Sequence, residues 1–393
     1  MVPLLALVGA AGAAGAAPFL PASDAVILET LPIRYDPALA GLTGLRSQWL
    51  RDPAQLSSAI PLVRAYIDAA RRNGDPRFLG YAQAILAHWG EDDRTPADVR
   101  VLRATILQSL HQFADALHEL DLVLARQPEQ AQALLTRATI LQVQGRFAEA
   151  QRDCGRLWRN AGEVTAGLCL ANVASVTGRL QAAAGLARRA LASSPDSDTV
   201  SRLWAQTLLA EIAVREGQND WAREGFQAAL RIDATDRYVR AALCDVLLDQ
   251  GRDDEVLALT AEQSRDDNLL LRRGLALQAL AASPVEAKSG SDVAKALRES
   301  VALLQDRHAA AQLRGDATHL REAARMALEL LHEPAVSLAL ARANWAVQKE
   351  PADARILLQA ALAAGDEGTR RQLQAWLRES GLVDARLNAL LHS

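Results

Sequence analysis

A 34-residue repetition limits, more than any other feature, what this chain can fold into. The hexapeptide RATILQ occupies Arg103–Gln108 and occurs again at Arg137–Gln142. The segments that follow also correspond, with HQFADA at His111–Ala116 and GRFAEA at Gly145–Ala150. A fixed period of this length is typical of arrays in which helical hairpins stack on one another. We therefore expect a chain of stacked antiparallel helix pairs.

Three landmarks extend the period along the chain: a small residue in the first helix, a turn residue, and a small residue in the second helix. Each series advances by 34, 33, 39 and 34 residues. Small residues let the two helices of a hairpin cross closely, and glycine suits the left-handed turn that ends the first helix. The five extra residues of the third interval lie around SSPDSDTVS, whose loop composition predicts a longer connection. The three series are Ala104, Ala138, Ala171, Ala210, Cys244; His111, Gly145, Gly178, Gly217, Gly251; and Ala116, Ala150, Ala183, Ala222, Val256.

At these residues the chain resembles the tetratricopeptide repeat family, whose period is 34 residues. The resemblance is clear over about residues 61–265 and loose over about residues 293–365. It implies an all-α, right-handed superhelical α-solenoid of antiparallel helix pairs. GDPRFLGYAQA near Gly74 and the RATILQ pair are also similar to segments of an uncharacterised group of exported bacterial repeat proteins. That similarity implies a fold and export, and adds no activity.

The same landmarks divide the chain into five segments. Residues 1–17 are apolar and resemble a secretory signal, and residues 18–60 are expected to cap the first repeat. Residues 61–282 are expected to form an array of about six repeats. Residues 283–292 are polar and predict a flexible linker. Residues 293–393 predict a degenerate, repeat-like helical region that ends in a helical cap.

The first residues favour export. No charged residue precedes Asp24, and the stretch Val2–Phe19 is too short and too rich in alanine and glycine for a good membrane span. A small-residue cleavage site is expected after Ala17, which would leave no stable span after processing. The sequence therefore predicts a periplasmic or otherwise exported bacterial protein. A cytoplasmic protein with an apolar tail is the alternative.

Composition and motifs argue against several function classes. The formal net charge is −4, which does not predict a nucleic-acid-binding surface. The common motifs of metalloproteases, phosphate-binding loops and serine hydrolases are absent from the sequence. We therefore expect no cofactor, no metal and no catalytic residue. A catalytic role for the C-terminal half would need His308, His319 or His332 to lie among carboxylates.

Two of the three cysteines lie on helices that stacking places side by side. Cys154 falls on the second helix of one repeat and Cys169 on the first helix of the next. In an oxidising compartment a disulfide could join them and link the two repeats. The alternative is that both pack as small buried apolar residues.

The first helices are expected to line a concave groove, and the groove is the candidate binding site. Amide and hydroxyl side chains there can pair with the backbone of an extended peptide, and aromatic side chains can anchor it. The later part of the groove is acidic, which favours a neutral to basic segment. The candidates are Thr105, Gln108, Thr139, Gln142, Asn172, Ser175, Trp204, Glu211, Tyr238, Asp245 and Asp249.

Together these features predict a non-catalytic scaffold that holds a protein or an extended peptide in its groove. The alternative is a cytoplasmic assembly chaperone or regulatory module with the same fold. The sequence does not indicate the oligomeric state.

Overall fold

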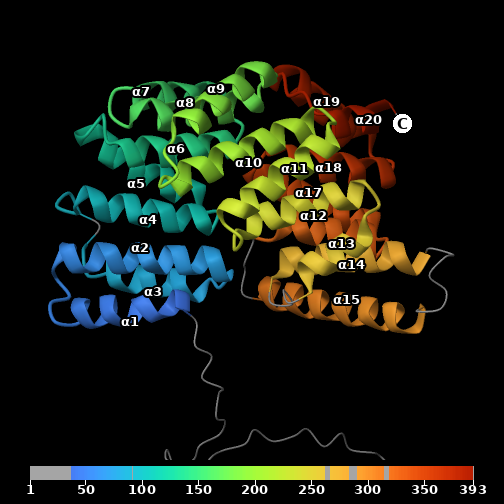
Figure 1. Ribbon diagram of the computed structural model, residues 1–393, viewed down its shortest axis with the longest axis horizontal. Helices are drawn as coiled ribbons and strands as arrows, with labels where there is room; N and C mark the ends of the chain where they lie inside the picture. The colour runs from blue at the N-terminus through green and yellow to red at the C-terminus, as the bar shows by residue number, and fades with distance from the viewer. Residues whose placement is uncertain (1–36, 91, 262–265, 283–289, 314–317, 393) are drawn as a thin grey trace, which may run out of the picture.

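The computed structural model describes residues 37–90, 92–261, 266–282, 290–313 and 318–392 (Figure 1). Within these ranges the regular structure is entirely helical. A first helix, α1 (Pro37–Trp49), packs on α2 and covers the start of the array. The predicted signal-like segment lies outside the described residues.

Antiparallel helix pairs follow α1 along the whole chain. Six pairs precede residue 261, and further pairs continue to α19 before a short last helix, α20 (Ala385–His392). The chain is thus an all-α helical repeat solenoid. The pairs are α2 (Leu56–Asn73) with α3 (Arg77–Leu86), α4 (Ala97–Ser109) with α5 (Phe113–Arg126), α6 (Ala131–Val143) with α7 (Phe147–Leu157), α8 (Gly162–Ser175) with α9 (Leu180–Ser193), α10 (Thr199–Arg215) with α11 (Asn219–Ile232), α12 (Arg237–Asp249) with α13 (Asp253–Thr260), α14 (Asp267–Ala282) with α15 (Gly290–Leu313), α16 (Leu320–Arg325) and the π-helical turn η2 (Met326–Leu330) with α17 (Pro334–Val347), and α18 (Pro351–Ala363) with α19 (Glu367–Ser380).

The three landmark series have the structural roles that their residue types predict. All ten small residues of the two helix series are at most 2% exposed. All five turn residues have a positive φ, from 57° at His111 to 77° at Gly145. A side-chain carbon added at Gly225 would lie 2.8 Å from Cβ of Ala210, which shows how closely paired helices cross.

Two boundaries differ from the sequence-based expectation. The longer third interval mostly lengthens a helix, because α10 has 17 residues whereas α6 has 13. Asp198 caps this longer helix by accepting a hydrogen bond from the backbone N–H of Ser201. Of the predicted linker, residues 283–289 lie outside the described ranges, and α15 begins at Gly290 and packs against α14. Helical pairing therefore continues across the expected break.

A disulfide joins Cys154 on α7 to Cys169 on α8. The two Cα atoms are 5.4 Å apart and the residues are separated by 15 positions in sequence. Both residues are buried in the same apolar cluster as Leu134 and Leu157. The bridge therefore links two successive repeats through the middle of their shared core.

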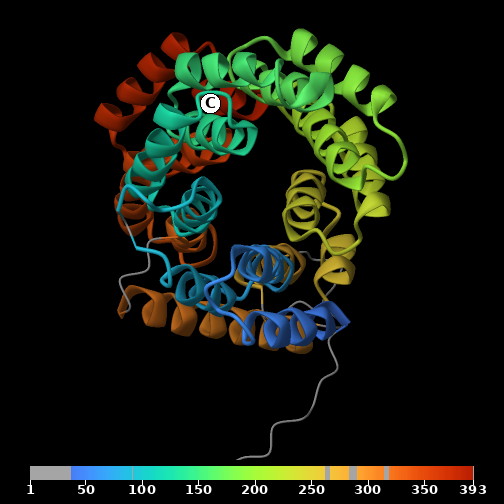
Figure 2. The same cartoon turned by 90° about the vertical axis from the view of Figure 1, so that its left-hand side faces the viewer.

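The C-terminal helices return to the early repeats, so the solenoid closes on itself (Figures 1 and 2). The backbone N–H of Lys349 donates to the carbonyl of Val143 at the end of α6, at 2.7 Å. The indole of Trp376 on α19 lies 4.8 Å from that of Trp345 and 6.4 Å from the ring of Phe147, between ring centroids. Figure 2 shows the resulting ring of helices around a central space.

Candidate functional site

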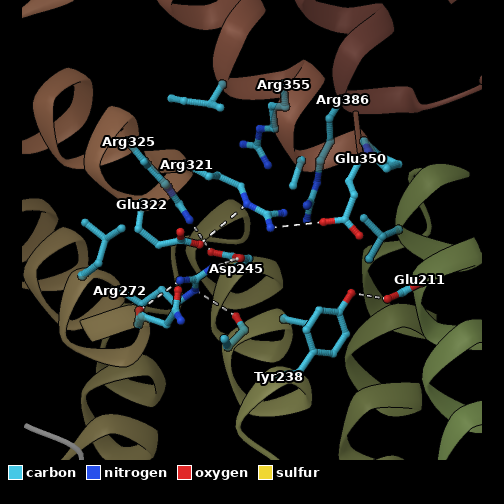
Figure 3. Close-up of a pocket in the computed structure, with 18 of the residues that line it drawn as sticks. Glu211, Tyr238, Asp245, Arg272, Arg321, Glu322, Arg325, Glu350, Arg355 and Arg386 are labelled. Carbon is cyan, nitrogen blue, oxygen red and sulfur yellow. Dashed lines mark hydrogen bonds and ion pairs between the residues drawn. The ribbon is translucent and has the colours of Figure 1, made fainter. Parts of the chain in front are cut away.

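A cavity of about 600 Å³ occupies the centre of the ring. Residues of α6, α8, α10, α12 and α14 line one side, and residues of α16, α18 and α20 line the other. Many of these side chains are charged, and arginines from the C-terminal helices face carboxylates of the inner repeat helices (Figure 3). The site is therefore made by two parts of the chain that are far apart in sequence.

Asp245 on α12 is held between two guanidinium groups. One oxygen lies 2.6 Å from Arg272 on α14, and the other lies 2.6 Å from Arg325 on α16. Burial alone would raise the pKa of Asp245, but the two positive charges outweigh burial and hold the pKa well below its usual value. The carboxylate of Asp245 is thus ionised at neutral pH. Its negative charge is balanced by the two guanidinium groups of the same chain.

Asp249, at the end of α12, is also shared by two arginines. It lies 3.0 Å from Arg355 on α18 and forms an ion pair with Arg386 on α20. Burial lowers the pKa of Arg386, and the charge of Asp249 opposes that shift without cancelling it. One carboxylate therefore serves two partly buried guanidinium groups.

Tyr238 and Glu211 form a third polar contact in the cavity. The Tyr238 hydroxyl donates to the Glu211 carboxylate, whose negative charge raises the pKa of the tyrosine well above its usual value. Tyr238 is 62% exposed, and this exposed surface faces the cavity. Arg215, one helical turn beyond Glu211, is buried and lies 3.3 Å from the same carboxylate. Tyr238 therefore presents an aromatic ring to any molecule inside the ring of helices.

Arg321 on α16 faces the start of α18. Its guanidinium lies 3.1 Å from Glu350 and 3.3 Å from Asp353. Asp353 is fully buried and accepts hydrogen bonds from the backbone N–H of Glu350 and from the Asn344 side chain. Burial opposes the charge of Arg321, but the neighbouring carboxylates outweigh it and raise the pKa of this arginine. These bonds fix the direction in which Arg321 enters the cavity.

The structure brings about half of the sequence-predicted groove residues to this cavity. Trp204 is half-buried and packs against two apolar clusters of the early repeats. Thr105 and Thr139 donate to carbonyls of their own helices, and Gln108 lies outside the cavity lining. The residues that line the cavity or pair with its lining are Gln142, Asn172, Glu211, Tyr238, Asp245 and Asp249.

Ser175 corrects the prediction. Its side chain is completely buried, and its hydroxyl donates to the carbonyl of Asn172 at 2.7 Å. Ser175 is the last residue of α8. Because its side chain is buried, Ser175 cannot contact a ligand.

Sequence reasoning missed the arginines of the C-terminal helices. Arg325 and Asp245 are separated by 80 residues, and Arg355 and Asp249 by 106, so no repeat period relates them. One sequence feature points toward them, because only three lysines accompany the many arginines of the chain. Arginine is the cation best suited to buried, bidentate ion pairs.

These ion pairs also remove the reason for expecting a basic partner. The carboxylates of Asp245 and Asp249 are the acidic part of the groove, and each is paired with two arginines of the same chain. Glu211 is likewise engaged by Tyr238 and Arg215. The negative charge that the sequence places in the groove is therefore not available to a ligand.

Two features are absent from the described residues. His, Cys, Asp and Glu side chains there form no group of three or more that could hold a metal ion, although His319 lines the cavity. None of the described helices is both long and apolar enough to cross a membrane.

The stacked hairpins and the cavity that they enclose define an all-α helical repeat protein. No family model and no curated protein matches the chain. One similar solved structure is a Rap protein complexed with competence and sporulation factor, at 12% identity and a TM-score of 0.44, covering 87% of this chain and 99% of that chain. Another is the TPR domain of P58(IPK), at 15% identity and a TM-score of 0.24, covering 90% and 96%.

Proposed function

We propose that the protein is a non-catalytic scaffold that binds a short polypeptide segment in the central cavity. The observation that supports this proposal is the cavity itself, which is about 600 Å³ in volume and is lined by charged and apolar side chains from distant parts of the chain. Ligand pockets in proteins commonly measure about 300–1,000 Å³. This volume holds a few residues of a peptide and not a segment that runs along the whole groove.

Side chains suited to peptide recognition line the cavity on the repeat side. Gln142 and Asn172 offer both donors and acceptors for a peptide backbone, and Tyr238 offers an exposed ring. Aromatic residues of this kind contribute a large share of the binding energy at protein interfaces. The segment is therefore expected to contact α6, α8 and α12.

A peptide-library selection on the purified full chain tests this proposal. The selected peptides are measured against the wild type and Tyr238→Ala by fluorescence polarisation. We expect Tyr238→Ala to weaken binding by about tenfold or more, because an anchoring ring is lost. The matched control is Tyr81→Ala on α3, which removes a tyrosine that is 53% exposed and lies outside the cavity lining. Equal affinity for the wild type and Tyr238→Ala would reject the cavity as the binding site.

We further propose that the protein acts in an oxidising compartment such as the bacterial periplasm. The disulfide between Cys154 and Cys169 supports this location, because disulfides persist there and are rare in the cytosol. The mass of the protein purified from its host tests the proposal. A chain that begins near Pro18 and keeps the disulfide is expected, whereas an intact Met1 with free thiols favours the cytoplasmic alternative.

A further inference from the structure

Several arginine nitrogens that line the cavity make no well-formed hydrogen bond. Among the described side chains, eight buried polar atoms make no hydrogen bond of good geometry, and four of them are arginine nitrogens that line the cavity. Two of these four, on Arg321 and Arg386, lie within ion-pair distance of Asp353 and Asp249, and the other two, on Arg215 and Arg237, have no such contact. No carboxylate oxygen of the lining is among the eight. A buried donor without a partner is costly, so these positions favour the arrival of acceptor oxygens. The four atoms are Arg215 Nη1, Arg237 Nη1, Arg321 Nε and Arg386 Nη2.

Two of the cavity arginines come from α18 and α20, which pack against each other. Arg355 and Arg386 share the single carboxylate of Asp249. Arg386 contacts that carboxylate, but its Nη2 does not have the geometry of a hydrogen bond to it. Burial lowers the pKa of Arg386 from its ordinary value, and the nearby charge of Arg355 lowers it further, while Asp249 opposes both effects.

A third guanidinium group, that of Arg215 at the end of α10, lies close to this place. Arg215 is only 7% exposed, and it shares the Glu211 carboxylate with Tyr238. The turn after α10 touches the start of α20, because a side-chain carbon added at Gly217 would lie 3.1 Å from Cβ of Ala385. Arg215 and Arg386 therefore enter the same end of the cavity from adjoining elements.

Figure 3 shows how the arginines of the C-terminal helices are directed. Arg321, Arg355 and Arg386 come from three different helices, and their guanidinium ends point toward the middle of the pocket. Guanidinium groups bind carboxylate and phosphate through paired N–H···O bonds, which an ammonium group does not provide. Chloride or water can fill the space but cannot accept such paired bonds.

We propose that Arg215, Arg355 and Arg386, assisted by Arg321, form an oxyanion-binding site that takes a carboxylate or phosphate group of the bound molecule. This inference rests on the proposed function where the group belongs to a polypeptide segment. Arginines of the C-terminal helices bind the anionic group, and the repeat helices contact the rest of the segment. The expected occupant is thus acidic or carries a terminal carboxylate or a phosphate.

Isothermal titration calorimetry with the full chain tests the site. The probes are inorganic phosphate, succinate and a hexaglutamate peptide, at constant ionic strength set with chloride. We expect all three to bind the wild type, and Arg386→Gln to weaken binding by about tenfold or more, because a charge-assisted pair is lost. Arg378→Gln is the matched control, since Arg378 is exposed on α19 and outside the cavity. It should bind as the wild type does.

A second variant changes affinity in the opposite direction. Asp249→Asn removes the carboxylate that Arg355 and Arg386 share, so both guanidinium groups become free for a ligand. We expect Asp249→Asn to bind phosphate and succinate several-fold more tightly than the wild type does. Its melting temperature should be lower than that of the wild type without the anion, and should rise more when the anion is added. A merely structural role for Arg386 would make both variants bind more weakly. Circular dichroism checks that each variant is folded, and Arg355→Gln replaces Arg386→Gln if the latter is not.

The outcomes separate this inference from the proposed function. Absence of phosphate and succinate binding, or equal binding by the wild type and Arg386→Gln, overturns the oxyanion site and leaves only solvated arginines. Selected peptides that depend on Tyr238 but not on Arg386 support the proposed function and reject this inference. Small anions that depend on Arg386, with no peptide bound by the wild type, support the site and reject the proposed function.

Discussion

At the scale of single residues, the chain gives its carboxylates fixed partners within the cavity. Asp245 contacts Arg272 and Arg325, which come from helices on opposite sides of the cavity. A carboxylate that is charged and paired in the folded state stabilises that state relative to the unfolded chain. Closure of the ring therefore depends on ionisation of a few acidic side chains.

The acid stability of Asp245→Asn is the first prediction at this scale. Because the folded-state pKa of Asp245 lies below the unfolded value of about 3.9, its contribution is complete above that pH and is lost as the pH falls further. We expect Asp245→Asn to lower the free energy of unfolding at pH 7 by about 3–5 kcal/mol, since two arginines lose a partner. The wild type should then lose about 1.4 kcal/mol per pH unit below pH 4 from this group, and the variant none.

Urea unfolding at pH 7, 5, 4 and 3 measures this difference. Asp68→Asn, at an exposed position on α2, is the control and should follow the wild type at every pH. A gap between Asp245→Asn and the wild type that stays constant down to pH 3 would contradict the assigned role of Asp245.

At the scale of the elements, the turns that end the first helices reverse the chain, and one of them also contacts the C-terminal region. Their left-handed backbone reverses the chain, and at Gly178 the turn is also a contact surface for the C-terminal region. A side-chain carbon added at Gly178 would collide with the carbonyl of Gly381, whereas one added at Gly251 would meet open space. The φ values of the two glycines are similar, at 75° and 65°. Alanine at Gly251 therefore introduces backbone strain alone. Alanine at Gly178 introduces the same strain together with a collision against the C-terminal region.

We predict different losses for alanine at these two turns. Gly251→Ala should cost about 1–2 kcal/mol, the usual penalty for a side chain in the left-handed region. Gly178→Ala should cost at least about 1 kcal/mol more, because backbone at Gly381 must also shift. Equilibrium denaturation of both variants checks this. An equal decrease in the free energy of unfolding for both variants would mean that the turn after α8 does not contact the C-terminal region in solution.

The repeats were predictable from the sequence, and the closure was not. The turn glycines and the small crossing residues recur at a fixed spacing because each hairpin meets the same local demands. The contacts of Arg355 and Lys349 with the early repeats occur once each and have no period. A groove inferred from repeats alone is open, so the repeat pattern predicts ligand contact at Ser175 and Trp204, which in the structure pack into or against the core. Pairing of distant charges can be found only once the superhelix has been built.

At the scale of the whole molecule, closure changes how stability is distributed. In an open solenoid each repeat contacts only its neighbours, and a substitution acts locally. Here Trp376 packs against Trp345 of its own region and against Phe147 of the third helix pair. The two ends of the solenoid are thus expected to open together.

We predict that Trp376→Ala increases amide hydrogen exchange in α6 and α7. Each 1.4 kcal/mol lost from the docking should speed exchange in these helices by about tenfold. Exchange followed by mass spectrometry reports each helix separately. Trp221→Ala, at a tryptophan that is 69% exposed on α11, is the control and should leave α6 and α7 unchanged. Faster exchange confined to α17–α19 would show that the ends are independent.

The separation of 106 residues between Asp249 and Arg355 also fixes an order of events during synthesis. At roughly 5–20 residues per second, the ribosome completes α12 about 5–20 s before it makes the arginine that pairs with Asp249. Throughout that interval Asp249 has neither of its two arginine partners, and the groove is not yet covered by α18 and α20. A molecule too large to enter the finished ring could be captured only then, so co-translational assembly and later ligand exchange would admit different partners.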